Sequence, residues 1–298
     1  MDTGRGMGKG LFSTAGSDAG CLLLRLAAFA AGVGMVLLFL MIAAFALPLF
    51  ADSAAGGPFT WTWAPAQGRF GIMPMIAGSL LAGTSAIVMG WPLGFCLCCW
   101  MLCPEGEGRN GRGHARRAVG ALVRLMTAVP TVVYGFAAVF LLVPLLRQGF
   151  GGTGFSCFAA AVMLSLLVLP TIVLVLQAGL GPRLEAVELQ CAALGMSRLE
   201  ALWHVVLPQC RRVLLASVIL GFGRAVGDTM LPLMLAGSAP VLPAGMLASM
   251  RTLTAHMALV TSNEVGGAAY GSLFMAGFLL LALNAAVSLT LRRMGGRQ

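Results

Sequence analysis

The sequence predicts an all-α membrane protein with six transmembrane helices and a polar helical hairpin between the fourth and fifth of them. Its 298 residues are 59% hydrophobic and only 10% charged, whereas a soluble domain is normally about a quarter charged. The apolar residues form long runs, and about 20 apolar residues in a helix suffice to cross a bilayer. One stretch between two such runs, Pro182–Arg212, is polar and has a helical pattern.

The first apolar run, Cys21–Phe50, is too long for the apolar region of a signal peptide, so we expect a retained helix. Residues 1–20 are rich in Gly and Ser and predict a short flexible tail. The polar loop Ala51–Gly71 follows, and its Trp61 and Trp63 suit a membrane interface. The expected divisions are a tail (1–20), a first span with its outer loop (21–71), and a five-span core (72–298).

The core spans are expected at apolar runs with short connections between them. Pro74 and Pro92 predict a kink in the second span, and Arg124 near the start of the third can extend back to the headgroups. The short basic segment Pro104–Arg117 and the longer segment Ser238–Ala268 are expected to be loops. The five expected spans are Ile72–Cys103, Ala118–Leu146, Cys157–Gly181, Val213–Gly237 and Ala269–Leu291.

The basic residues predict the orientation of the chain in the membrane. Six spans place both termini on one side, where most of the Lys and Arg residues lie, while Arg69, Arg147 and Arg251 lie in loops on the other side. This bias predicts that both termini and Pro182–Arg212 are cytoplasmic. The net charge of +9 is therefore interpreted as topology and contact with lipid headgroups, not nucleic-acid binding, because no basic face is present.

Other reactive residues give weaker signals. Cys96, Cys98, Cys99 and Cys103 could form a metal site, but small buried side chains at the end of a span are the favoured interpretation. His114, His204 and His256 are expected to be solvated or interface residues. The sequence has no Gly-Lys phosphate-binding loop and no nucleophile–base pair, so we expect no catalytic residues, no metal and no ATP hydrolysis in this chain.

The polar stretch Pro182–Arg212 predicts two short helices. Leu194, Leu199 and Leu202 recur at helical spacing, and Gly195 suits a break. Ser197 with Glu200 three residues later is a capping-box pattern, and Pro208 is expected to end the second helix. An amphipathic helix of this kind fits a groove in a partner protein or lies on the lipid surface, and periodicity leaves both open.

One motif in this hairpin resembles a known family. Gly195, followed after nine residues by Val205-Val206-Leu207-Pro208, is similar to G-x9-I-x-L-P, the second half of the "EAA" loop of ABC-importer permeases. In that family the loop is the coupling helix, which sits in a cleft of the ATPase subunit. The Glu-Ala-Ala part has no counterpart here, because Leu189, Gln190 and Cys191 occupy its positions. The resemblance implies coupling roles for Glu188, Gly195, Met196, Ser197, Leu207 and Pro208.

Three further stretches resemble the phosphate branch of these permeases, the PstC/PstA family. They are Val129–Pro144, Leu169–Val173, and Gly223–Gly237 together with Arg251–Leu259, the last being more similar to PstC. The resemblance implies the type I importer permease fold in the bacterial inner membrane. It also implies a second, PstA-like permease, two PstB-like subunits that hold ATP and Mg²⁺, and a periplasmic PstS-like phosphate-binding protein. No cofactor is expected on this chain.

Arg224 is the candidate substrate contact. It lies twelve residues beyond Arg212, about 18 Å along a helix and so near the middle of a core about 30 Å thick. A charge at that depth indicates a substrate pathway, and a guanidinium suits phosphate oxygens. Asp228 at i+4 can pair with it, and Thr229 adds a hydroxyl. The family has R-A-x-G-E-T here, whereas this chain has R-A-V-G-D-T.

The expected function is that of a phosphate-importer permease working by alternating access, with Arg224, Asp228 and Thr229 in the pathway. Three alternatives stay open. Arg224 and Asp228 could form a structural ion pair that holds two helices together. The substrate could be another oxyanion, such as molybdate or sulfate. The chain could also be a membrane sensor or scaffold without transport.

Overall fold

Long helices make up almost all of the computed structural model, which describes residues 14–51, 59–103, 112–263 and 268–295. By length and composition, five helices of these residues can cross a membrane. They are α1 (Thr14–Ala51), α2 (Met73–Leu102), α4 (Thr131–Phe150), α5 (Cys157–Ala193) and α11 (Ala268–Gly295). There is a sixth crossing if Arg198–Gln209 and α8 (Arg211–Gly227), which are bent by 78° relative to each other, count as one span. The expected all-α class with six spans is confirmed.

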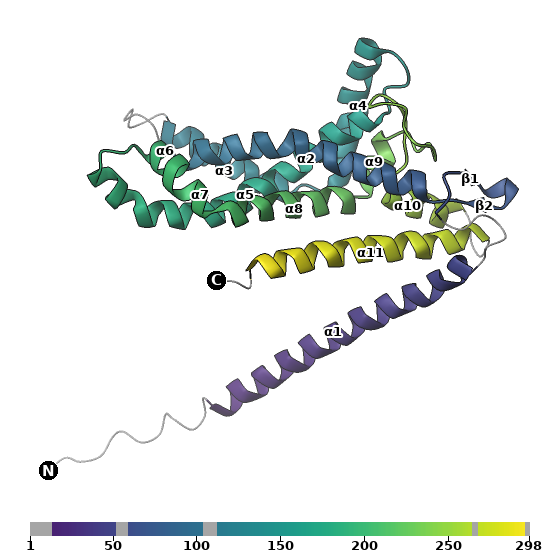
Figure 1. Cartoon of the computed structure of the whole chain (residues 1–298), viewed down its shortest axis with the longest axis horizontal. Coiled ribbons are helices and arrows are strands. Elements are labelled where there is room, and N and C mark those ends of the chain that lie inside the picture. Colours follow the sequence, from purple (N-terminus) through teal and green to yellow (C-terminus); the bar gives the residue numbers. More distant parts are fainter. Residues whose placement is uncertain (1–13, 52–58, 104–111, 264–267, 296–298) are drawn as a thin grey trace.

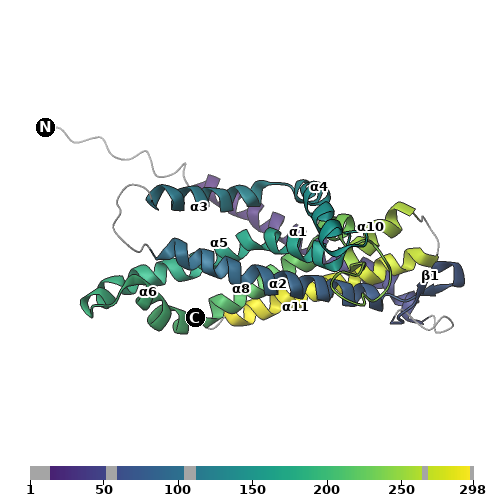
Figure 2. The same ribbon diagram turned by 90° about the horizontal axis from the view of Figure 1, so that it is seen from above.

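The helices α2, α5, α8 and α11 run along one common axis (Figures 1 and 2). The polar hairpin lies at one end of this bundle, here called the hairpin end. A small β ribbon of β1 (Trp63–Ala64) and β2 (Arg69–Phe70) lies at the opposite end, here called the ribbon end. Helix α1 contacts α11 near the ribbon end, where Phe45 stacks on Phe274 at 4.9 Å, and diverges from the bundle toward its N-terminus (Figure 1).

Helix α5 forms the centre of the bundle. Its side chains at every fourth position are fully buried on one face: Leu164, Val168, Ile172, Leu176, Leu180 and Leu184. Between membrane helices, close packing stabilises such contacts, and small residues at the interface permit it. On α2, a Cβ at Gly90 would lie 2.9 Å from the Ser165 carbonyl oxygen, and one at Gly94 would lie 2.9 Å from Ile172. Two glycines of α2 thus set its distance from α5.

The expected third span, Ala118–Leu146, is interrupted near Pro130, and the helix long and apolar enough to cross a membrane is α4 alone. Helix α3 (Arg112–Ala128) ends two residues before α4 begins, because Pro130 has no N–H and disfavours a helical residue before it. The Tyr134 hydroxyl donates to the Met126 carbonyl at 2.9 Å and joins the two halves. The end of the expected loop Pro104–Arg117 is also helical from Arg112, and its residues 104–111 lie outside the described residues.

Three other predictions need correction or confirmation. Pro92 lies inside the continuous helix α2 and does not divide it. The fourth span continues beyond Gly181 to Ala193, so the first arm of the polar hairpin is the end of α5. The expected fifth span Val213–Gly237 is not continuous: α8 ends at Gly227 and a six-residue helix, α9 (Met230–Leu235), follows.

Candidate functional site

The break between α8 and α9 contains two of the three predicted pathway residues. Asp228 leaves the helical conformation, with φ −74° and ψ 134°. Its Oδ2 accepts a hydrogen bond from the Leu231 amide at 2.9 Å, so its carboxylate caps the start of α9 in the way that Asp commonly caps helices. Thr229 follows, and its carbonyl accepts from the Leu233 amide at 3.1 Å. Asp228 therefore fixes the direction in which the chain resumes as α9.

Arg224 lies in the last turn of α8 and is exposed on the surface of this chain. No hydrogen bond or ion pair joins its guanidinium to another of the described residues. Its charge acts on the nearby Tyr134 hydroxyl and Asp228 carboxyl, but the expected ion pair with Asp228 does not form. The carboxylate is turned toward the Leu231 amide instead. The interpretation of the two residues as a structural ion pair thus has no support in the geometry.

Helix α10 (Leu253–Asn263) contacts the break between α8 and α9 on the side of the ribbon end. The Thr254 hydroxyl donates to the Asp228 carbonyl at 2.9 Å, and the Leu253 amide donates to the buried Ser79 hydroxyl of α2 at 2.7 Å. Gly78 lies directly against the Arg251 carbonyl, where a Cβ would collide with it. Sequence reasoning missed Thr254 and Ser79, because a hydroxyl in an apolar segment does not indicate which distant backbone group it will meet.

His256 is buried, contrary to the expectation of a solvated or interface residue. Its Nε2 lies 3.2 Å from the Ser272 hydroxyl of α11, and the edge of the Trp63 ring packs against it with centroids 4.4 Å apart. Burial, together with the positive charge of Arg251, lowers the pKa of His256 to about 4. This histidine is therefore neutral at physiological pH and joins the β ribbon, α10 and α11. The expected exposure of His204 is confirmed.

The second interrupted helix meets the first. Helix α4 packs against α9, and Gly135 of α4 faces the Met234 sulfur with no room for a Cβ. Tyr134, the residue before Gly135, lies within the electrostatic reach of Arg224. The two interrupted helices thus meet where α4 packs against α9, and Arg224 lies in the turn just before the second break. Discontinuous membrane helices at a charged residue are typical of transporter binding sites.

The turn of the polar hairpin forms as predicted. Gly195 has φ +76°, a conformation that favours glycine, and the Met196 amide donates to the Cys191 carbonyl at 3.0 Å. Ser197 and Glu200 form the predicted capping box, and these hydrogen bonds lower the pKa of Glu200. The helical arm that follows comprises α6 (Arg198–Glu200), a π-helix (Ala201–Val206) and α7 (Leu207–Gln209). Pro208, predicted to end the second helix, lies in the last turn of this arm, one residue before the helix ends at Gln209.

The hairpin is fixed to the bundle by contacts that sequence reasoning did not find. The Arg198 guanidinium pairs with Glu188 at 3.0 Å across its two arms. Trp203 packs edge-on against Phe95 of α2 at 6.0 Å, and Phe95 stacks on Trp91. The Trp91 indole N–H then donates to the Ser217 hydroxyl of α8 at 2.9 Å. A row of aromatic rings thus links the hairpin to the helix that carries Arg224.

The inner and outer surfaces of the hairpin differ in exposure. Leu202, Val206 and Leu207 are buried against the bundle, whereas Leu189 and Leu194 at its tip are 84% and 78% exposed. Gly195, Ser197 and Pro208 are also exposed, and Met196 is half-buried. Of the predicted coupling residues, Gly195, Met196 and Ser197 thus form the turn at the tip, whereas Leu207 and Pro208 lie at the far end of the second arm, beside α8. Two of the clustered cysteines, Cys98 and Cys103, are buried, and the Cys103 thiol donates to the Arg198 carbonyl at 3.7 Å.

Comparison with known proteins identifies the family. The profile described as "Binding-protein-dependent transport system inner membrane component" matches residues 106–297, well over half of the chain. The chain belongs to this family. It is accordingly a multi-span membrane subunit of the ABC importer permease class, and its place is the bacterial inner membrane.

Individual relatives of this permease are distant. It is 27% identical to the probable ABC transporter permease protein YqgH of Bacillus subtilis, over 80% of this chain and 76% of that protein. It is 26% identical to the phosphate transport system permease protein PstC of Pasteurella multocida, over 79% and 78%. Its fold resembles a chain of an inward-facing MetNI methionine ABC transporter, with a TM-score of 0.52, 18% identity, and coverage of 78% of this chain and 99% of that one.

Proposed function

We propose that this permease is the PstC-like membrane subunit of an ATP-driven phosphate importer. A second, PstA-like permease would complete the anion pathway between the two subunits. The similarity to PstC proteins supports phosphate. The observation that carries the proposal is the Arg224 guanidinium, unpaired among the described residues, beside two interrupted membrane helices. An unpaired charge inside a membrane is costly, so its retention points to a charged substrate.

Arg224 would contact the anion during its passage. A guanidinium presents planar, paired donors that match two phosphate oxygens, which a lysine ammonium does not. Asp228 is held by the Leu231 amide, and because its carboxylate repels an anion, it would block passage beyond Arg224 until the break rearranges. Thr229 would add a hydroxyl donor. The short helix α9 would move as the pathway opens from one side to the other.

The polar hairpin would transmit ATP-driven closure to this pathway. Its tip presents Leu189, near the end of α5, and Leu194, just beyond that end, to solvent, and leucines exposed at a helix end suit the groove of a partner protein. Two PstB-like subunits would bind the tip and would hold ATP and Mg²⁺, while this chain would bind no cofactor. The hairpin and both termini would then lie in the cytoplasm. A periplasmic PstS-like protein would deliver phosphate at the ribbon end.

The test is uptake of radiolabelled phosphate by cells that lack their own phosphate permease. They would express this chain with its partner permease, its ATPase and its binding protein. Arg224→Ala is expected to lower uptake roughly a hundredfold at normal abundance, because removing a charged contact costs about 3 kcal/mol. Arg224→Lys keeps the charge but loses the paired donors, and it is also expected to lose uptake. Arg124→Ala is the matched control, since Arg124 is also an exposed arginine, on α3, and its replacement should leave uptake unchanged.

Asp228 variants separate its two roles. Asp228→Asn keeps an oxygen for the Leu231 amide but removes the charge, whereas Asp228→Ala removes both. Loss of uptake in both variants, with Asp228→Asn at normal abundance, would support a role for the charge. Full uptake in Arg224→Lys would refute the bidentate contact. The substrate would be reassigned to another oxyanion by two results together. These are an intact wild-type complex that takes up no phosphate, and a binding assay in which molybdate or sulfate displaces phosphate.

A further inference from the structure

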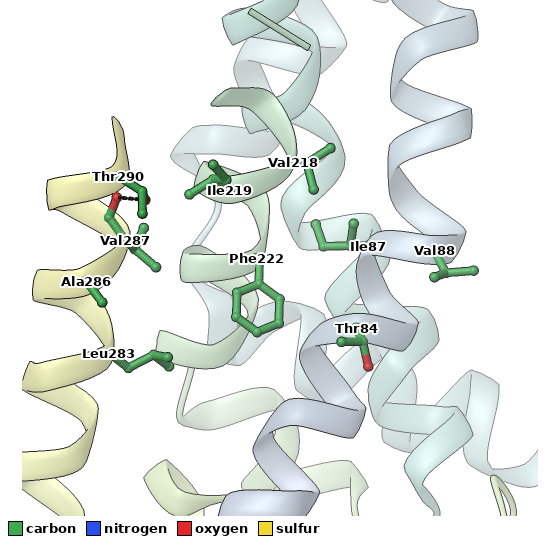
Figure 3. Close-up of a pocket in the computed structure, with 10 residues that line it drawn as sticks. All are labelled: Thr84, Ile87, Val88, Val218, Ile219, Phe222, Leu283, Ala286, Val287 and Thr290. Carbon is green, nitrogen blue, oxygen red and sulfur yellow. Dashed lines mark hydrogen bonds between the residues drawn. The ribbon is translucent and has the colours of Figure 1, made fainter. Parts of the chain in front are cut away.

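An apolar groove opens on the side of the bundle between α2, α8 and α11. Its volume is about 450 Å³, and Figure 3 shows its side chains converging from the three helices. Val218 and Phe222 line it from α8, Ile87 from α2, and Leu283 from α11. We call this feature the α8–α11 groove. The site described above does not use it.

The described residues that line the groove offer no free hydrogen-bonding group. The two polar side chains among them are Thr84 and Thr290, and both hydroxyls donate to carbonyls of their own helices: Thr84 to Leu80 at 2.7 Å, and Thr290 to Val287 at 2.7 Å. Because the lining presents hydrocarbon alone, a phosphate ion or another polar solute gains nothing there. An apolar ligand is required.

The three helices approach one another closely at the end of the groove that lies toward the ribbon end. Gly83 of α2 lies close to α8, where a Cβ would stand 2.6 Å from Val226 and 2.9 Å from Phe222. Gly223 of α8 similarly faces Val287 of α11. These small residues let the helices approach, and the space extends from there toward the hairpin end, where Thr290 and Val218 lie (Figure 3).

Two arginines stand at the other end of the groove. Arg211 begins α8 and is on the same helix face as Val218 and Phe222, seven and eleven residues on. Arg293, in the last turn of α11, is seven residues beyond the groove residue Ala286 and shares its face. Both arginines are exposed. The apolar lining of each helix thus continues directly into a positive charge.

The length of this arrangement matches one leaflet of a bilayer. From Phe222 to Arg211 and from Leu283 to Arg293 the helices rise about 15 Å at 1.5 Å per residue. Half of a hydrocarbon core about 30 Å thick is also about 15 Å. We infer that the α8–α11 groove binds an anionic phospholipid, with one acyl chain along the groove and the phosphate between Arg211 and Arg293. Such basic sites between membrane helices favour acidic headgroups.

The test measures lipid bound to the full chain, purified with its partner subunits in mild detergent. Nanodiscs with equal phosphatidylglycerol and phosphatidylcholine would supply the probes, and native mass spectrometry would count the retained lipids. Arg211→Gln with Arg293→Gln should reduce the preference for phosphatidylglycerol roughly thirtyfold, since each basic residue near the surface contributes about fivefold. Arg117→Gln, at an exposed arginine of α3, is the charge control and should leave the preference unchanged.

A second pair of variants tests the acyl-chain site. Val218→Trp fills the groove and should remove the retained lipid whatever its headgroup, whereas Leu220→Trp, at a 37% exposed position on the opposite face of the same helix, should not. Retention equal to wild type in both Val218→Trp and the double arginine variant would overturn the inference. So would lipid that binds the isolated chain but not the complex, because the groove would then be covered by the second permease.

Discussion

Protonation of His256 is expected to destabilise the ribbon end of the permease. The side chain is fully buried between Trp63 and Ser272, and the nearby charge of Arg251 opposes a second positive charge. Its pKa is lowered from 6.5 to about 4. The unfolded chain therefore takes up a proton from about pH 6.5 downward, while the folded chain does not until about pH 4. Stability is thus constant above this window, falls as pH decreases through it, and levels off below it.

The size of the effect follows from the two pKa values. Between pH 7 and pH 4.5, this one proton should lower the free energy of unfolding by about 2.5 kcal/mol, since a tenfold difference in proton affinity between the folded and unfolded chain corresponds to about 1.4 kcal/mol. The assay is unfolding of the purified chain in mixed micelles, followed by tryptophan fluorescence at a series of pH values.

The control is His256→Phe, which keeps an aromatic ring against Trp63 but cannot bind a proton. Carboxylates elsewhere titrate equally in both proteins, so the difference between the two pH profiles reports His256 alone. The wild-type profile should fall more steeply below about pH 6.5 than that of the variant. Parallel profiles from pH 7 to pH 4.5 would refute the buried, neutral histidine.

Three further predictions concern packing and capping. Ser197→Ala removes the cap of α6 and should speed amide exchange at Glu200 about fivefold, since an N-cap contributes about 1 kcal/mol. Ser262→Ala, at an exposed serine near the end of α10, should leave that exchange unchanged. Gly78→Ala forces a Cβ against the Arg251 carbonyl and should lower stability by about 2 kcal/mol, whereas Gly32→Ala, in open space on α1, should be neutral. Trp91→Phe loses the hydrogen bond to Ser217 and should lower stability in thermal unfolding by about 1 kcal/mol. Trp61→Phe, at an exposed tryptophan, should leave that stability unchanged.

Features that depend on neighbouring residues were predictable from the sequence. The second span is expected at Ile72–Cys103 and α2 runs from Met73 to Leu102, because the length of an apolar run is itself the requirement for crossing a bilayer. The glycine turn at Gly195 and the capping box at Ser197 were also correct. In both features the donor and the acceptor of each hydrogen bond lie within a few residues of each other, so the local sequence contains both partners.

The candidate pathway was only partly predictable. The sequence indicated Arg224 from its depth in an apolar run, but it placed Asp228 as its ion partner at helical spacing. That inference assumed a continuous helix, and the helix ends at Gly227. The sequence around Asp228 has the same apolar periodicity on both sides whether the helix continues through it or ends there. The pattern alone therefore does not indicate the break.

The membrane class, the approximate positions of the spans, the polar hairpin and the charge within the fifth span therefore follow from the composition of short segments of the sequence. What those charges contact, and where the third and fifth spans are interrupted, depends on tertiary packing. Thr254 reaches the Asp228 carbonyl from a helix that follows the break, and Trp63 and Ser272 enclose His256 from opposite ends of the chain. Such pairings depend on how distant helices pack, and the free energy that selects them is shared among contacts that no local pattern records.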